Sequence, residues 1–233
     1  MLDVSVNLKL VRDRIQQAEK RFARVPGSVQ LIAVSKTKTV ELIREAITAE
    51  QKVFGESYIQ EAVDKIQQLS DIPLHWHFIG PIQSNKTKLI AENFEWVHGV
   101  DRLKIAQRLS AQRPDKLPDM NICLQVNVSE ESTKAGVALS ELPELIESIL
   151  TLPNINLRGF MAIPNRENDF QEQRKPFKLL SDTLEEMNKL FGLTMDTLSI
   201  GMSGDLEAAI AEGATFVRVG TDIFGERDYK KQV

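Results

Sequence analysis

The sequence predicts a (β/α)8 barrel, an α/β fold in which helices enclose eight parallel strands. Eight short apolar runs recur along the chain, each with the length of a buried strand. Longer amphipathic segments rich in helix formers separate these runs, so the repeating unit is a strand followed by a helix rather than a hairpin. The 233 residues are close to the length of about 250 typical of this fold, and we expect one domain over residues 1–233.

An additional helix precedes the first predicted strand. Apolar residues recur at helical spacing within residues 4–24, at Val4, Leu8, Val11, Ile15 and Ala18. Pro26-Gly27 then interrupts the pattern. The barrel therefore begins after an extra N-terminal helix.

The strands and helices of the barrel follow in alternation. The predicted strands are 30–35, 52–54, 76–79, 96–100, 121–128, 157–163, 197–202 and 216–220. The predicted helices are 39–50, 57–69, 85–93, 102–112, 140–151, 170–191 and 204–212. A doubly wound sheet is the alternative, but its dinucleotide fingerprint is absent, because Phe54-Gly55-Glu56 and Ile79-Gly80-Pro81 contain isolated glycines.

The composition is that of a globular protein with a full core, at 42% hydrophobic and 27% charged residues. A net charge of -4 argues against a nucleic-acid surface, because phosphate backbones are bound by clustered Lys and Arg. No apolar stretch approaches the roughly 20 residues that cross a bilayer, and the N-terminus lacks the pattern of a secretory leader. We expect a cytoplasmic protein that binds a small ligand rather than nucleic acid or membrane.

Lys36 directly follows the apolar run at residues 31–35. A lysine in this position lies at the carboxyl edge of the strands, where barrels build their ligand sites. Desolvation lowers the pKa of an amine and frees the neutral form that attacks carbonyls, so Lys36 is a candidate Schiff-base nucleophile. The alternative is a lysine that ends a strand and extends into solvent.

Two loops near the end of the chain have the character of a phosphate site. Gly201-Met202-Ser203-Gly204-Asp205 follows the seventh predicted strand and Gly220-Thr221 follows the eighth. A serine hydroxyl and free amides at the start of a helix favour an anion, and glycine lets the backbone approach it closely. Barrels commonly hold phosphate on these two loops. Read singly, Ser203 is a helix N-cap and Gly220 a turn residue.

A lysine and a phosphate site on neighbouring strands describe a ligand with both an aldehyde and a phosphate. Pyridoxal 5'-phosphate (PLP) is such a ligand. Arg218 lies two residues before Gly220, on the same face of the strand, where it would meet the pyridine nitrogen. The alternative for Arg218 is a structural ion pair with a carboxylate of the barrel.

The histidines and the cysteine support no metal or thiol chemistry. His75 and His77 alternate on one side of a strand, but no third ligand accompanies them at a suitable spacing, so we expect no metal. Packing or cofactor contact is expected of His77. Cys123 lies in an apolar strand and is expected to be an inert thiol.

Several motifs, in order and over nearly the whole chain, resemble the pyridoxal-phosphate homeostasis protein family. They are Ala33-Val34-Ser35-Lys36-Thr37, Phe54-Gly55-Glu56-Ser57-Tyr58, Trp76-His77-Phe78-Ile79-Gly80, Gln83-Ser84-Asn85-Lys86, Gly159-Phe160-Met161-Ala162-Ile163, Gly201-Met202-Ser203-Gly204-Asp205, Arg218-Val219-Gly220-Thr221 and Phe224-Gly225. The resemblance implies the fold-type III PLP barrel shared with the N-terminal domain of alanine racemases. The sequence departs from the family pattern at Ser57, usually asparagine, and at Asp222, usually a small residue.

The resemblance also implies the roles of the site residues. Lys36 would hold PLP as an internal aldimine, and Arg218 would face the ring nitrogen. Ser203, Gly220 and Thr221 would bind the phosphate. We assign Ser57, His77 and Met161 to the same cofactor site.

The function that follows is a PLP-binding protein in intracellular PLP homeostasis, expected to be a monomer without a catalytic residue. PLP-dependent apoenzymes are the expected partners. The alternative is an amino-acid racemase, which needs an acid/base on each face of the substrate; Lys36 serves one face, and the only tyrosines for the other are Tyr58 and Tyr229. A Schiff-base aldolase acting on a phosphorylated sugar ranks third.

Overall fold

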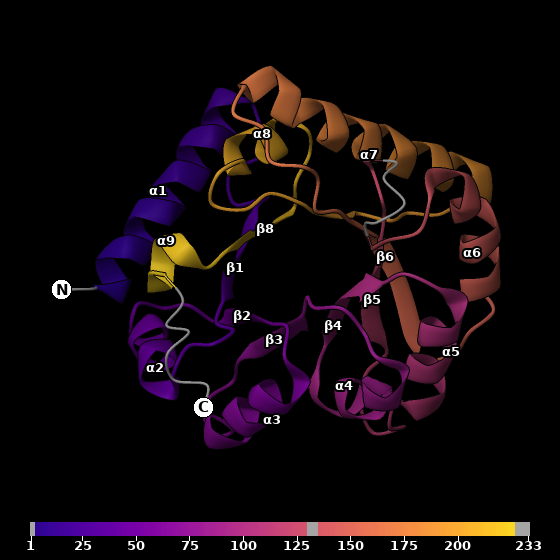
Figure 1. The fold of residues 1–233 in the computed structure, drawn as a ribbon, viewed down its shortest axis with the longest axis horizontal. Coiled ribbons are helices and arrows are strands. Elements are labelled where there is room, and N and C mark those ends of the chain that lie inside the picture. The colour runs from indigo at the N-terminus through magenta and orange to yellow at the C-terminus, as the bar shows by residue number, and fades with distance from the viewer. Residues whose placement is uncertain (1–2, 130–134, 227–233) are drawn as a thin grey trace.

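The computed structural model describes residues 3–129 and 135–226. It forms a closed barrel in which each parallel strand pairs with the next and β8 pairs with β1 (Figure 1). The strands are β1 (Gln30–Val34), β2 (Val53–Glu56), β3 (His75–Phe78), β4 (Trp96–Val100), β5 (Met120–Gln125), β6 (Ile155–Met161), β7 (Thr197–Ser199) and β8 (Phe216–Val219). The predicted (β/α)8 barrel is confirmed.

Helices surround the barrel, as the ring of coiled ribbons in Figure 1 shows. They are α1 (Val4–Arg21), α2 (Val40–Thr48), α3 (Ile59–Gln68), α4 (Thr87–Asn93), α5 (Leu103–Gln112), α6 (Leu142–Ile149), α7 (Phe170–Phe191), α8 (Leu206–Ala211) and α9 (Thr221–Phe224), with 3-10 helices η1 (Ser84–Lys86) and η2 (Leu139–Glu141). The described chain contains no helix long and apolar enough to cross a membrane.

The structure differs from the sequence prediction mainly at element ends. β5 ends at Gln125 rather than at residue 128, and β7 ends at Ser199 rather than at residue 202. The four-residue helix α9 was not predicted, because residues 221–224 are too few to show helical periodicity. The phosphate-type loop after β7 therefore begins three residues earlier than predicted.

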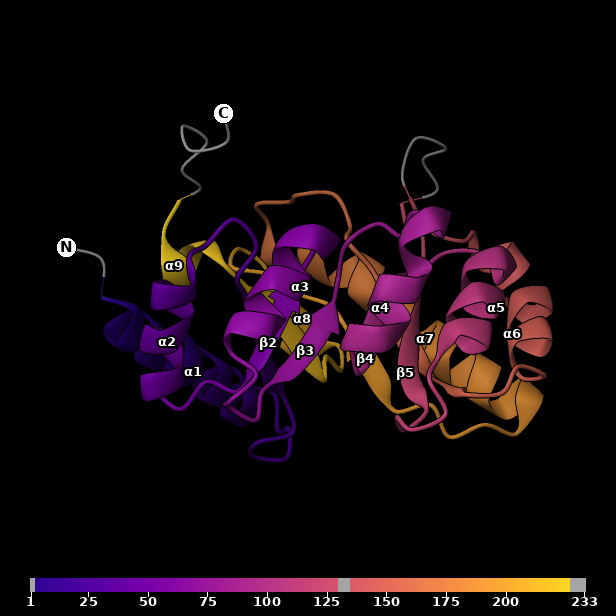
Figure 2. The same ribbon diagram turned by 90° about the horizontal axis from the view of Figure 1, so that it is seen from below.

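The extra N-terminal helix α1 covers a side of the barrel that α8 is too short to cover. Asp3 caps α1 by accepting a hydrogen bond from the Val6 amide at 3.0 Å. At 1.5 Å per residue, the 18 residues of α1 extend about 27 Å, whereas the six residues of α8 extend only about 9 Å. α1 packs against α8, α9 and α2, and Figure 2 shows α9 beside α1 and α2.

Aromatic side chains cross the interior of the barrel. His77 on β3 contacts Phe216 on β8 with ring centroids 5.3 Å apart, although these strands are not neighbours. His77 also stacks on Trp96 of β4 at 5.5 Å. These three rings line the cavity at the amino-terminal end of the strands, so they lie apart from the carboxyl end that carries Lys36.

Candidate functional site

Lys36 lies at the carboxyl end of β1 and lines a cavity of about 540 Å³. Five of the predicted site residues line this cavity, namely Lys36, Ser203, Arg218, Gly220 and Thr221. They come from the ends of β1, β7 and β8, and β8 pairs with both other strands. The closed barrel thus brings together residues that are far apart in the sequence.

A buried ammonium group fixes the backbone on the N-terminal side of Lys36. Lys65 of α3 donates to the Ser35 carbonyl at 2.7 Å and to Glu56 Oε1 at 2.8 Å. The Ser35 hydroxyl donates to the same Glu56 oxygen at 2.7 Å. Burial raises the pKa of the Glu56 carboxyl, and the charge of Lys65 opposes that rise.

A carboxylate fixes the backbone on the other side of Lys36. The Thr37 amide donates to Glu61 Oε1 at 2.6 Å, and Lys65 donates to the same oxygen at 2.5 Å. Thr37 has φ of 63°, a left-handed conformation that a β-branched residue rarely adopts. The hydrogen bond to Glu61 stabilises this turn, and the turn sets the direction in which Lys36 leaves the strand.

The loop after β7 presents Ser203 to the cavity. The helix N-cap is Asp205 rather than Ser203, and its carboxylate accepts a hydrogen bond from the Met202 amide at 2.6 Å. Among the described residues, the amides of Ser203 and Gly204 make no hydrogen bond to a protein acceptor. The N-cap alternative for Ser203 is therefore wrong, and its hydroxyl lies beside two amides that are available to an anion.

Gly220 brings the loop after β8 against the strand that carries Lys36. A Cβ atom at Gly220 would lie 3.2 Å from the Val34 carbonyl oxygen and 3.3 Å from Val34 Cβ, closer than such atoms normally pack. Gly220 is the N-cap of α9, and Thr221 is the first residue of that helix. The absence of a side chain at Gly220 thus lets this loop and the lysine share one cavity.

Arg218 is buried at the floor of the same cavity. Its guanidinium donates to the Ser199 carbonyl, to Ser199 Oγ at 2.8 Å and to the Ala162 carbonyl at 3.1 Å. Burial lowers the pKa of Arg218 to about 10, and the carboxylate of Asp205 opposes the shift. At neutral pH the group remains a cation. Oxygens of the two preceding strands hold it, and the described residues show no direct ion pair to a carboxylate.

Three predicted site residues do not line this cavity: Ser57, His77 and Met161. His77 Nδ1 lies 2.9 Å from Nε2 of His98, and burial lowers the pKa of His77 to about 3. Met161 is 1% exposed at the end of β6. The backbone of Ser57 packs against Gly80, where a Cβ would meet the Ser57 carbonyl oxygen at 2.5 Å. Of the two expectations for His77, packing or cofactor contact, these contacts fit packing.

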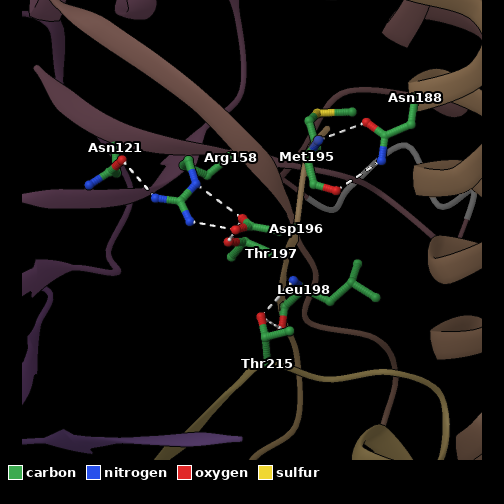
Figure 3. Close-up of polar contacts among 8 residues, drawn as sticks. All are labelled: Asn121, Arg158, Asn188, Met195, Asp196, Thr197, Leu198 and Thr215. Carbon is green, nitrogen blue, oxygen red and sulfur yellow. Dashed lines mark hydrogen bonds and ion pairs between the residues drawn. The ribbon is translucent and has the colours of Figure 1, made fainter. Parts of the chain in front are cut away.

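A larger cavity, of about 1340 Å³, lies at the opposite end of the barrel. There Arg158 donates to both carboxylate oxygens of Asp196, at 3.0 and 2.6 Å, and to Asn121 at 3.2 Å (Figure 3). Its guanidinium also lies 5.0 Å from the centre of the Trp96 ring. Arg158 and Asp196 thus satisfy each other at this end, and its lining contains neither Lys36 nor the phosphate-type loops.

Metal and thiol chemistry find no support in the described residues. No group of three His, Cys, Asp or Glu side chains in residues 3–129 and 135–226 is arranged to hold a metal ion. Cys123 is buried, and burial raises its pKa, which keeps the thiol protonated and unreactive.

Several residues of the cavity were missed by the sequence analysis. Arg166 lines it from the loop after β6, and the rule that strand ends carry the site would have found it. Lys38 lines it two residues after Lys36, and its ammonium donates to the carbonyls of Phe224 and Gly225 at 3.0 and 2.9 Å. No sequence signal marks Lys38, because its acceptors lie at the other end of the chain.

The cavity fits a small ligand that carries an aldehyde and an anionic group. It offers the amine of Lys36, a hydroxyl beside two available amides, and a buried guanidinium. An amine can bond covalently to the carbonyl of an aldehyde, while the hydroxyl and the amides can donate hydrogen bonds to a phosphate. A guanidinium is a hydrogen-bond donor only, so it pairs with a ligand nitrogen that acts as an acceptor.

Comparison with known proteins identifies the family. Residues 6–228 match the family model for the N-terminal domain of alanine racemase. The chain is 55% identical over 229 residues to the pyridoxal phosphate homeostasis protein of Pseudomonas aeruginosa, covering 98% of both. It is 49% identical over 235 residues to the protein of the same name from Escherichia coli K12, covering 100% of both.

Solved structures agree. PipY of Synechococcus elongatus, a structure with PLP bound, is 35% identical with a TM-score of 0.85, over 95% of this chain and 100% of that one. An alanine racemase of Clostridium difficile has a TM-score of 0.72 at 16% identity, over 98% of this chain and 58% of that one, which shows a shared fold alone. This chain belongs to the pyridoxal phosphate homeostasis protein family, on the barrel of the alanine racemase N-terminal domain.

Proposed function

We propose that this protein holds PLP covalently through Lys36 and takes part in intracellular PLP homeostasis. The observation that carries the proposal is the shared cavity of about 540 Å³, into which β1, β7 and β8 bring an amine, a phosphate-type loop and a buried cation. Membership of the family, and the PLP-bound structure of a relative that is 35% identical, support the choice of ligand.

Lys36 has the covalent role in this proposal. Its amine attacks the aldehyde carbon, a C=N bond forms and water leaves. The hydrogen bonds of Lys65 and Glu61 fix the backbone on both sides of Lys36, so little conformational freedom is lost when the linkage forms.

The remaining cavity residues hold the two ends of the ligand. Ser203, with the amides near Gly204, Gly220 and Thr221, binds the phosphate, each hydrogen bond to a charged oxygen contributing roughly 1.5–3 kcal/mol. Arg218 faces the ring nitrogen. A cationic partner disfavours protonation of that nitrogen, so the bound ring is a weak electron sink. The site therefore favours holding and releasing the cofactor over turning over amino acids.

The covalent role of Lys36 is tested by reduction. After incubation with PLP and treatment with borohydride, peptide mapping should place the adduct on Lys36, and Lys36→Ala should lose the absorbance of the lysine linkage. Lys38→Met is the matched control, because Lys38 lines the same cavity and should leave the adduct on Lys36. An adduct that maps to another lysine in the wild-type protein contradicts the assignment.

A role in PLP homeostasis requires that the bound PLP can be transferred to other proteins. The holo-protein should restore activity to a PLP-dependent apoenzyme in the presence of a phosphatase that destroys free PLP. Activity that recovers only when the phosphatase is omitted would indicate transfer through free solution and argue against direct delivery.

A further inference from the structure

One arginine on the N-terminal helix contacts the loop after β7 and the helices α8 and α9. Arg14 Nη2 donates to the Ser203 carbonyl oxygen at 2.9 Å, and Nη1 donates to Asp222 Oδ2 at 2.8 Å. Its Nε and Nη2 donate to Glu207 at 2.9 and 3.1 Å. Ser203 lies in the loop after β7, Glu207 in α8 and Asp222 in α9, so a single guanidinium joins three segments that the chain does not connect locally.

Arg14 also neutralises the negative charge of the two carboxylates that it contacts. Glu207 and Asp222 place two carboxylates behind the loops that are proposed to receive a phosphate. Hydrogen bonds and charge from Glu207, followed by Asp222, raise the pKa of Arg14, which keeps it cationic. Without Arg14, these two carboxylates would lose their ion-pair partner, and their negative charge would disfavour an anion bound on these loops even with partial solvent screening.

Further contacts hold α1 in place against these segments. Asn7 Nδ2 donates to the Ile223 carbonyl of α9 at 3.0 Å, about two helical turns before Arg14 along α1. Val11 and Ile15, on either side of Arg14, are buried in the core. The helix that carries Arg14 is therefore rigidly docked, and the guanidinium has a fixed position from which to orient the loops.

We propose that Arg14 is a positioning residue of the phosphate site: it aligns the Ser203 loop with the Gly220-Thr221 loop and neutralises the carboxylates behind them. This inference rests on the proposed function. It makes the extra N-terminal helix part of the ligand site, although Arg14 does not line the cavity. Asp222, where the family usually has a small residue, is then one half of a pair that this chain forms with Arg14.

The test compares a ligand with the phosphate and one without it, and reads the change in each affinity from wild type to variant. Affinities for PLP and for pyridoxal are measured with the wild-type protein and with Arg14→Ala, Arg14→Lys, Ser203→Ala and Arg12→Ala. Arg14→Ala should weaken PLP binding roughly tenfold and leave pyridoxal binding unchanged, as expected for a coupling between two interacting groups. Arg14→Lys keeps the positive charge but loses the two-pronged hydrogen bonding of the guanidinium. It should give a smaller loss of affinity, confined to PLP.

The other variants are controls. Ser203→Ala should show the same PLP-specific loss as Arg14→Ala. Arg12→Ala should change neither affinity, because Arg12 lies on the same helix but donates to the Ala49 carbonyl at 2.8 Å and to Gln51 at 3.1 Å, away from the phosphate loops. If Arg14→Ala does not fold, as judged by circular dichroism, Arg14→Lys carries the test.

The outcomes separate this inference from the function on which it rests. Equal losses for PLP and pyridoxal in the Arg14 variants, or no loss at all, overturn the positioning role. A wild-type protein that binds PLP no better than pyridoxal overturns the proposed phosphate site itself. A PLP-specific loss in Ser203→Ala without one in Arg14→Ala overturns this inference alone.

Discussion

At the scale of single residues, Lys36 is held by a network that sequence position alone does not reveal. The ammonium of Lys65 donates to the peptide carbonyl of Ser35, and the carboxylate of Glu61 accepts from the peptide amide of Thr37. The carboxylate of Glu56 accepts from Lys65 and from the Ser35 hydroxyl. The Lys65–Glu56 pair is nearly inaccessible to solvent, with side-chain exposures of 5% and 0%. Removing one partner of such a pair leaves a buried charge, so these residues protect the geometry of Lys36 more than they add net stability.

A pH dependence of stability is expected from His77. Burial lowers its pKa from 6.5 to about 3, so between these values the unfolded chain binds a proton that the folded protein does not. The contribution is present above the unfolded pKa and is lost as the pH falls. We expect the free energy of unfolding to fall by about 2 kcal/mol between about pH 7.5 and about pH 5 on account of this group.

Urea unfolding at several pH values measures this slope. His77→Phe should reduce it, whereas His75→Gln should not, because His75 is an exposed residue on the same strand. The burial of His98 lowers its pKa in the same direction, so part of the slope should remain in His77→Phe. A slope unchanged in His77→Phe would contradict the assignment.

At the scale of elements, the pairing of β6 with β7 depends on a glycine. Gly159 has φ of 152°, and a Cβ atom there would lie 1.9 Å from the Thr197 carbonyl oxygen. Because that oxygen belongs to the neighbouring strand, a side chain at Gly159 cannot be accommodated without separating the two strands. β6 and β7 carry the Ala162 and Ser199 oxygens that hold Arg218 at their ends, so the effect reaches the site.

Gly159→Ala should therefore lower the free energy of unfolding by at least about 3 kcal/mol. Denaturant unfolding followed by circular dichroism measures the change. Gly204→Ala is the control, because a Cβ there meets nothing within 4 Å, and it should leave stability nearly unchanged. Equal stability of the two variants would show that β6 and β7 adjust to the added methyl group.

At the scale of the whole molecule, the barrel fold is shared with alanine racemases. Whether this chain could racemise amino acids depends on whether its cavity holds the acid/base groups that the reaction needs. Racemisation requires a proton donor on the face opposite Lys36. Among the described residues that line the cavity there is no tyrosine, and Tyr58 is 50% exposed outside that lining. Tyr229 lies outside the described residues.

We therefore expect no sustained turnover of amino acids. The PLP-loaded protein is incubated with L- and D-alanine and other amino acids, and chirality is followed over time, with Lys36→Ala as the control. Repeated turnovers that disappear in Lys36→Ala would contradict the proposed carrier function and support a racemase.

The sequence by itself determined the fold class and the placement of Lys36, Ser203, Arg218 and Gly220. These follow from local patterns, because apolar periodicity marks strands and helices, and a residue that directly follows a barrel strand must lie at the carboxyl rim. The sequence motifs shared with the family indicated which ligand the site binds.

Only the tertiary structure decided which side chains support those residues. The hydrogen bond of Arg14 to Asp222 and the hydrogen bonds of Lys65 beside Lys36 join residues on separate elements. Sequence periodicity shows that a face is buried but not which element it packs against. His77 shows the same limit: its alternation with His75 indicated a face of β3, but closure of the barrel decided that this face meets Trp96 and Phe216 rather than the site.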